Sequence, residues 1–295
     1  MFGSYNTVDI LVNSVLAFIM LGLGLTLTTN DFKNIFFHPK PLIVALLLQI
    51  IALPIISFTI GLLSGLTDEV KVGIVIVSVC ASGASSNLIT HLFKGNVAMS
   101  ISMTVINSMI TLISIPLIIN LALVVFLGYT TEIKLPFFET MFQLFLVSIF
   151  PASLGIIIRK FRPAFAKSLE APSKIILTLL LGLVFTLKIF LSESNGGTGI
   201  QISEIFSIFP FVFLLNIAAM LLGFYGSGLF KVGFVNRYTT AIEVGLHNTA
   251  LALLISGSIL QKTEMEKPAI VYAMFSFFTA VLFTFLIKKI YKNKS

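Results

Sequence analysis

Residues 96–127 read NVAMSISMTVINSMITLISIPLIINLALVVFL, a run in which no side chain is charged. A helix needs about 20 mainly apolar residues to cross a hydrocarbon layer of roughly 30 Å, and this run exceeds that length. Comparable runs recur along all 295 residues and leave no room for a soluble domain. Only helices and closed barrels satisfy every backbone polar group in lipid. The sequence therefore predicts an all-α integral membrane protein with one polytopic domain, residues 1–295.

The composition points the same way. Hydrophobic residues make up 57% of the chain and charged residues only 11%, which is more apolar surface than one soluble core could bury. The single Cys80 excludes an internal disulfide. No Lys or Arg precedes the first apolar stretch, so we expect that stretch to remain as a span and not to be cleaved as a signal peptide.

We expect about nine transmembrane helices. They lie at roughly 9–27, 40–66, 71–90, 96–127, 136–158, 172–192, 201–229, 237–260 and 268–290. Pro41, Pro172 and Pro268 are expected in the first turns of three of them, where the missing N–H is tolerated.

Basic residues predict the orientation, because Lys and Arg near span ends prefer the cytoplasmic side. Threading nine spans puts fourteen Lys and Arg residues on one side and four on the other. The N-terminus should then face outside and the C-terminus the cytoplasm. The net charge of +7 reflects this topology and contact with anionic membrane lipids, without any need for nucleic acid. Lys188, near an outer helix end, is expected to snorkel to the surface.

An offset of about 161 residues brings the two halves of the chain into register. It places Asn87 opposite Asn248, and the spans around them keep step. Repeat one covers about 9–127 and repeat two about 172–290, with 136–158 as the connecting span. An odd number of crossings separates matched spans, so the repeats should be inverted. Inverted repeats are typical of transporters that bind substrate and ions near the midplane at interrupted helices. Coincidence in a low-complexity apolar sequence is the alternative.

Glu243 stands in the middle of the eighth expected span, whereas the other acidic residues fall in loops or near helix ends. Acids inside a membrane mark ion or proton pathways, although a buried polar partner could also satisfy one. Residues 243–249, EVGLHNT, concentrate polar atoms and a glycine, which predicts a helix break. The mirrored segment 81–87, ASGASSN, is also breakable. Freed carbonyls and side-chain oxygens there could bind a hard cation, while exposed helix N-termini favour an anion. Close helix packing through small residues is the competing interpretation.

Further polar side chains fall inside the expected spans. Ser100 and Thr104 are four residues apart and so share one helical face. Gln49 has no local reason to face lipid, and His247 lies one turn from Glu243. A His and Glu pair is too little for a transition-metal site.

Read together, these residues resemble the bile acid:sodium symporter family over nearly the whole chain. Residues 22–27 (GLGLTL) followed by Asp31-Phe32 and His38-Pro39-Lys40 look like its first cytoplasmic loop, and residues 95–100 (GNVAMS) look like its turn into an ion-binding helix. Residues 243–246 (EVGL) with Asn248 match most closely. The resemblance implies a panel domain and a core domain, the latter with two crossed, discontinuous helices, in a nine-span bacterial form.

The resemblance also implies a binding site. The first sodium ion would be held by Ser86, Asn87, Ser100, Thr104 and Glu243. The second would be held by Gln49, Glu243, Val244, Leu246 and His247. Substrate would lie near Asn87 and Asn248.

The sequence departs from the family pattern in two places. His247 replaces a Gln ligand, which puts the second sodium site in doubt. Residues 81–84 (ASGA) replace a Pro-Gly-Gly-Thr run and alter the substrate wall. We therefore expect a pantoate-like 2-oxo or 2-hydroxy acid in preference to bile acid itself.

The function predicted from the sequence is sodium-coupled symport of a small organic anion, bile-acid-like or pantoate-like, by alternating access in a monomer. Proton-coupled transport is the first alternative, because an acid beside a His can carry protons. An intramembrane enzyme is a weaker one, since only Glu243 and His247 could supply its chemistry, and no catalytic residue is assigned.

Overall fold

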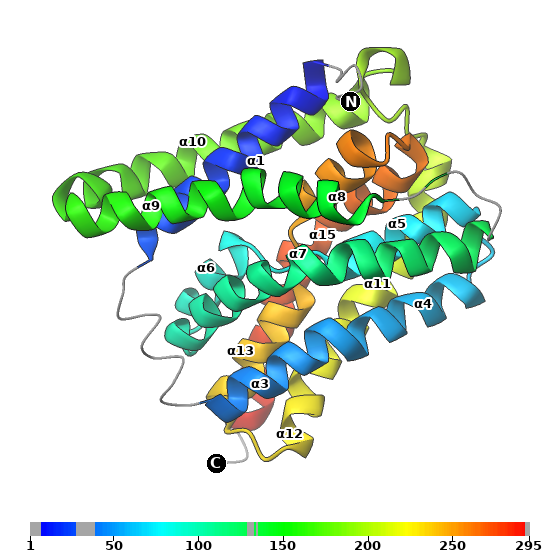
Figure 1. Ribbon diagram of the computed structural model, residues 1–295. Helices are drawn as coiled ribbons and strands as arrows, with labels where there is room; N and C mark the ends of the chain where they lie inside the picture. Colours follow the sequence, from blue (N-terminus) through cyan, green and yellow to red (C-terminus); the bar gives the residue numbers. More distant parts are fainter. Residues whose placement is uncertain (1–6, 28–38, 129–132, 134, 293–295) are drawn as a thin grey trace.

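The computed structural model describes residues 7–27, 39–128, 133 and 135–292 (Figure 1). Every regular element among those residues is helical and none is a strand. The first half of the chain forms α1 (Thr7–Thr26), α3 (Pro39–Leu47), η1 (Leu48–Ala52), α4 (Leu53–Leu63), α5 (Asp68–Val79), α6 (Ala84–Leu92) and α7 (Val97–Leu127). The prediction of an all-α membrane protein is confirmed.

The second half forms α8 (Phe137–Leu144), η2 (Phe145–Ile149), α9 (Phe150–Phe161), α10 (Pro163–Phe190), η3 (Glu193–Asn195), α11 (Ile202–Leu221), η4 (Leu222–Gly226), α12 (Ser227–Leu229), α13 (Phe234–Gly245), α14 (Thr249–Leu253), η5 (Leu254–Ile259) and α15 (Thr263–Lys292). The segments η1, η2, η4 and η5 are π-helical turns within longer helices. Such turns often occur at functional sites.

Seven helices in the described part of the chain are long and apolar enough to cross a membrane. They are Thr7–Thr26, Pro39–Leu63, Val97–Leu127, Phe137–Phe161, Ile202–Leu229, Phe234–Ile259 and Thr263–Tyr291. Ile175–Phe190 is apolar but shorter, and the third expected span is divided between α5 and α6. The count of nine spans and the inverted repeat stay predictions.

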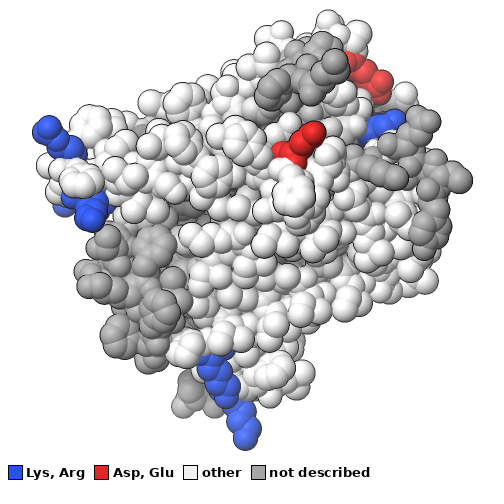
Figure 2. Space-filling model, in the orientation of Figure 1, with Lys and Arg blue, Asp and Glu red and all other residues white. Residues whose placement is uncertain are grey.

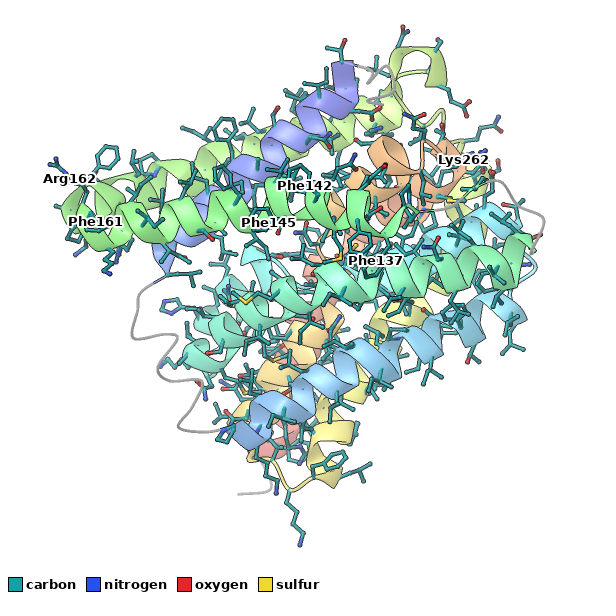
Figure 3. All side chains as sticks on the ribbon, in the orientation of Figure 1. Phe137, Phe142, Phe145, Phe161, Arg162 and Lys262 are labelled. Atoms are coloured by element: carbon teal, nitrogen blue, oxygen red, sulfur yellow. The ribbon has the colours of Figure 1, made fainter. Side chains whose placement is uncertain are left out.

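The surface fits a lipid environment. Most of the face in Figure 2 carries neither acidic nor basic side chains. On this side of the molecule Phe142 and Phe145, labelled in Figure 3, are 60% and 39% exposed. Arg162 lies at one end of the molecule and Lys262 at the opposite end (Figure 3). Large apolar side chains exposed between two charged ends are what a bilayer requires of a spanning protein.

Helices α1, α9 and α10 pack on one another in the upper part of Figure 1, and α8 continues into α9 through η2. We call these four helices the panel bundle, and the helices α3 to α7 and α11 to α15 the core bundle. Glycines bring α1 and α9 into backbone contact: a Cβ added to Gly24 would lie 2.1 Å from the carbonyl oxygen of Ala152. One added to Gly155 would lie 2.4 Å from the carbonyl oxygen of Leu21. Close approach through small residues is a common way for membrane helices to pack.

Three expectations are corrected. Pro172 and Pro268 lie inside α10 and α15, because these helices begin earlier, at Pro163 and Thr263. Lys188 does not snorkel: it is 2% exposed, and its ammonium group binds acidic side chains inside the protein. His38 and the Asp31-Phe32 pair lie outside the described residues.

Candidate functional site

Two helices of the core bundle are interrupted where the sequence predicts a break. Residues 80–83 separate α5 from α6, and residues 246–248 separate α13 from α14. Cys80 and Leu246, which follow the first half of each helix, both have extended backbones. The side chain of Asn248 accepts a hydrogen bond from Leu251 N at 3.0 Å and so caps α14. Asn is a favoured N-cap residue because its side chain satisfies a free N–H group of the first turn.

The two interruptions touch. The backbone nitrogen of Asn248 donates to the carbonyl oxygen of Ala81 at 3.0 Å. Nδ1 of His247 lies 3.2 Å from the carbonyl oxygen of Cys80. A Cβ added to Gly83 would lie 4.0 Å from Cγ of Asn248, so this side chain faces the other break. The helix ends of both halves thus meet at one crossing point inside the core bundle.

Glu243 lies in the last turn of α13 beside this crossing and is 1% exposed. Its carboxylate accepts hydrogen bonds from the hydroxyl groups of Ser82 and Ser100. Oγ1 of Thr104 lies 3.5 Å from the same carboxylate, and its nearer acceptor is the carbonyl oxygen of Ser100 at 3.1 Å. A buried carboxylate needs such donors, because burial without them is costly.

Asn87 and Ser86 complete this cluster from α6. The Ser100 hydroxyl lies 2.6 Å from Oδ1 of Asn87. The Ser86 hydroxyl also faces Glu243, but it donates its hydrogen to the carbonyl oxygen of Gly83 at 2.8 Å. The structure therefore brings together all five residues predicted for the first sodium ion, from α6, α7 and α13. That they bind sodium stays a prediction.

Ser82 was missed as a direct partner of Glu243. The sequence did carry a signal for it, since Ser82 and Glu243 are 161 residues apart, the offset of the predicted repeat. A second missed feature braces the end of α13: the carbonyl oxygen of Gly245 accepts from Nδ2 of Asn216 at 2.7 Å and from the Tyr272 hydroxyl at 2.5 Å. Both side chains are fully buried. They satisfy a carbonyl that the broken helix leaves without its helical partner.

The residues predicted for the second sodium ion are less closely joined. Nε2 of Gln49 lies 3.5 Å from the carbonyl oxygen of Ser78, and none of the hydrogen bonds among the described residues joins Gln49 to Glu243. Val244 is in the last turn of α13 and Leu246 follows it. Oε1 of Gln49 and Nε2 of His247 are both buried without a hydrogen-bond partner among the residues that the structure describes. Unpaired buried acceptors are unusual, and here two of them belong to one predicted ligand set.

The chemistry of the first cluster suits a hard monovalent cation. It offers one carboxylate, three or more hydroxyl groups and an amide oxygen, and such oxygen ligands are preferred by hard ions over nitrogen or sulfur. The α6 N-terminus opens onto the same crossing, and its N-cap residue Gly83 provides no side-chain cap. Its free N–H groups favour an anion nearby.

The chain is similar to proteins named as sodium-dependent transporters. The family described as Sodium Bile acid symporter family has a model that matches residues 14–195. A Bacillus subtilis protein named an uncharacterized sodium-dependent transporter, YocS, is 28% identical over 281 residues, which are 95% of this chain and 84% of that protein. The hepatic sodium/bile acid cotransporter of Rattus norvegicus is 29% identical over 84% of this chain and 67% of its own length.

A chloroplastic protein of Oryza sativa subsp. japonica, named a probable sodium/metabolite cotransporter, is 30% identical over 82% of this chain. The aligned part is 55% of that relative, so the chain matches only about half of its length. Every one of these relatives is named as a transporter, and none as an enzyme. The chain belongs to the sodium bile acid symporter family, a family of sodium-dependent membrane transporters.

Proposed function

We propose that this protein is a sodium-coupled symporter of a small organic anion and works by alternating access. The observation that carries the proposal is the buried Glu243 carboxylate, surrounded by hydroxyl groups of Ser82, Ser100 and Thr104 at the crossing of two interrupted helices. A single buried acid with neutral oxygen neighbours can bind one monovalent cation and balance its charge. Membership of the family supports sodium as that cation.

The first sodium ion binds Ser86, Asn87, Ser100, Thr104 and Glu243 in this proposal. The second uses Gln49, Glu243, His247 and the backbone of Val244 and Leu246. The wild type should bind this second ion weakly, because none of the hydrogen bonds among the described residues joins Gln49 to Glu243 and His247 offers nitrogen in place of oxygen. Sodium and substrate would bind at the same helix crossing. If sodium fixes the conformation of this crossing, each ligand raises the affinity of the protein for the other, and transport of the two is coupled.

The substrate binds beside the crossing, near Asn87 and Asn248. Both side chains are only half-buried, and the α6 N-terminus lies next to them. A carboxylate would be stabilised by the free N–H groups of that helix end, and the amide groups would orient the rest of the molecule. We expect a small 2-oxo or 2-hydroxy acid such as pantoate. The protein acts in the bacterial plasma membrane as a monomer, with the N-terminus outside.

The test is uptake into proteoliposomes under a sodium gradient, with potassium in place of sodium as the comparison and a screen of small organic anions as substrates. Glu243→Gln should abolish sodium-driven uptake and weaken sodium binding by at least about tenfold, equal to about 1.4 kcal/mol. Thermal stabilisation by sodium alone measures that binding. Glu139→Gln, an exposed acid in the first turn of α8, is the matched control.

Sodium-dependent uptake that survives Glu243→Gln unchanged would rule out the ion site. Uptake by the wild type that follows a pH gradient and ignores sodium would favour proton coupling instead.

A further inference from the structure

A second group of buried charges lies away from the Glu243 cluster, at the end of the molecule that includes Lys262 (Figure 3). Nζ of Lys188 donates to Oδ1 of Asp9 at 2.9 Å and to Oε1 of Glu266 at 2.8 Å. Lys188 lies near the end of α10, Asp9 in the first turn of α1 and Glu266 in the first turn of α15. One ammonium group therefore joins two helices of the panel bundle to one helix of the core bundle.

Both partners of the link between the bundles are buried, since Lys188 and Glu266 are each 2% exposed. Neither charge could remain there alone, because an unpaired buried charge is strongly unfavourable. Separation of the bundles at this end would have to expose both groups to water. Within the described part of the chain, Oε2 of Glu266 is buried without a hydrogen-bond partner, and Asp9, Lys188 and Glu266 all line one cleft of about 200 Å³.

Two neighbouring features support the same contact. Oγ of Ser258 in η5 donates to Oδ1 of Asn13 in α1 at 3.0 Å, which is a second polar link between the bundles. Gly257 leaves the room that Glu266 occupies, because a Cβ there would lie 1.7 Å from Oε1 of Glu266. The link thus depends on a glycine in the core bundle as well as on the charges.

We propose that Lys188, with Asp9 and Glu266, is a latch that holds the panel and core bundles together on the outer side and must open for the crossing to be reached from outside. The inference rests on the proposed alternating-access function. Salt bridges and hydrogen bonds that re-form are well suited to such a task, because solvation of the separated charges offsets much of the cost of breaking them. Apolar side chains in the same contact would not be stabilised by water when the bundles separate.

The chain contains a matched comparison. Nζ of Lys267 binds Glu204 of α11 at 2.7 Å and also Glu264 of α15. Lys267 is 4% exposed, so its burial is similar to that of Lys188. All three of these residues belong to the core bundle. The two acidic side chains of this triad are each 35% exposed, and breaking the triad removes a bond between Lys and Glu without touching the contact between the bundles.

The first experiment measures access from outside. A single cysteine at Thr249, at the start of α14, is labelled with a membrane-impermeant maleimide in a Cys80→Ala background without sodium. A cysteine at Ser194, exposed in the turn beside the cleft, identifies the outer side. We expect Glu266→Gln and Gly257→Ala each to increase outside labelling at Thr249 about tenfold, a population shift of about 1.4 kcal/mol. Glu264→Gln should leave the rate unchanged.

The second experiment closes the latch permanently. Asn13→Cys combined with Ser258→Cys allows the bundles to be joined by oxidation or a short bis-thiol cross-linker. We expect cross-linking to stop uptake and reduction to restore it, while sodium still stabilises the cross-linked protein against heat. Full uptake by the cross-linked protein, or equal labelling in the Glu266→Gln and Glu264→Gln variants, would overturn the proposal.

The two proposals fail separately. A wild-type protein that sodium does not stabilise would contradict the proposed function. The labelling comparison is made without sodium and still tests the latch.

Discussion

The hydroxyl group of Ser82 donates a hydrogen bond to Oε2 of Glu243, and the two residues are 161 positions apart in the sequence. The same offset places Asn87 opposite Asn248. In an inverted repeat, equivalent positions of the two halves meet where the pseudo-two-fold axis passes. Direct contact between Ser82 and Glu243 is therefore expected if the axis of the predicted repeat passes between these two residues.

This contact predicts a stability effect of Ser82→Ala. The Glu243 carboxylate would lose one donor in a buried site, and a hydrogen bond to a charged group is worth about 1.5–3 kcal/mol. We expect a lower melting temperature in the absence of sodium, with the stabilisation by sodium retained. Ser85→Ala, an exposed position in the same helix as Ser86, should have little effect. Loss of the sodium response in Ser82→Ala alone would instead make Ser82 a sodium ligand.

Local sequence signals were enough to predict the central features of the site. Glu243 stands out because acids are rare inside spans, and the glycine and polar residues that follow it predict the break after Gly245. The four-residue spacing of Ser100 and Thr104 predicts their shared face, and both hydroxyl groups lie beside the Glu243 carboxylate.

Features that depend on distant pairing could not be predicted in this way. Glu266 was read as an ordinary acid near a helix end, yet it binds Lys188, which lies 78 residues earlier in the chain. Burial of such a pair depends on how α10 packs against α15, and neither helix alone carries that information. The helix starts predicted at Pro172 and Pro268 were wrong, because membrane helices tolerate proline within them.

The crossing of α1 and α9 predicts that Gly155→Val destabilises the panel bundle. An added Cβ at Gly155 would lie 2.4 Å from the carbonyl oxygen of Leu21, which cannot move without shifting α1. Overpacking of this kind costs about 1–3 kcal/mol. Gly182→Val in α10 is the control, because no atom lies within 4 Å of a Cβ added there. Thermal denaturation in detergent measures both, and equal melting temperatures would contradict the close packing.

Asn248 has a structural and a proposed substrate role, and two substitutions separate them. Asp can replace Asn as an N-cap acceptor for Leu251 N, whereas Ala cannot, and loss of a cap costs about 1 kcal/mol. We expect Asn248→Asp to keep the wild-type melting temperature but to raise the KM for an anionic substrate at least about tenfold, because it adds a like charge and removes two amide donors. An unchanged KM in Asn248→Asp would leave Asn248 with the capping role only.

His247 gives the sharpest prediction about the second sodium ion. A carbonyl oxygen can only accept, so Nδ1 must donate its hydrogen to Cys80 O, which leaves Nε2 as a buried acceptor without a partner. Sodium prefers oxygen to this nitrogen, so the wild type should bind the second ion poorly. His247→Gln supplies an amide oxygen, and we expect the Hill coefficient for sodium in uptake to rise from about 1 towards 2.

Gln49 supplies the control for that measurement, since its Oε1 is the other buried acceptor of the predicted ligand set that has no hydrogen-bond partner among the described residues. Gln49→Ala introduced into the His247→Gln variant should return the Hill coefficient to about 1, because the restored second site would lose another side-chain oxygen. The same substitution in the wild type should leave the coefficient near 1, because the imidazole of His247 already weakens binding of the second ion there. A wild-type coefficient near 2 that Gln49→Ala lowers would show that the imidazole does not prevent binding of the second ion. Coefficients that stay near 1 in all four proteins would remove Gln49 and His247 from the ion site and leave Glu243 with a single sodium ion.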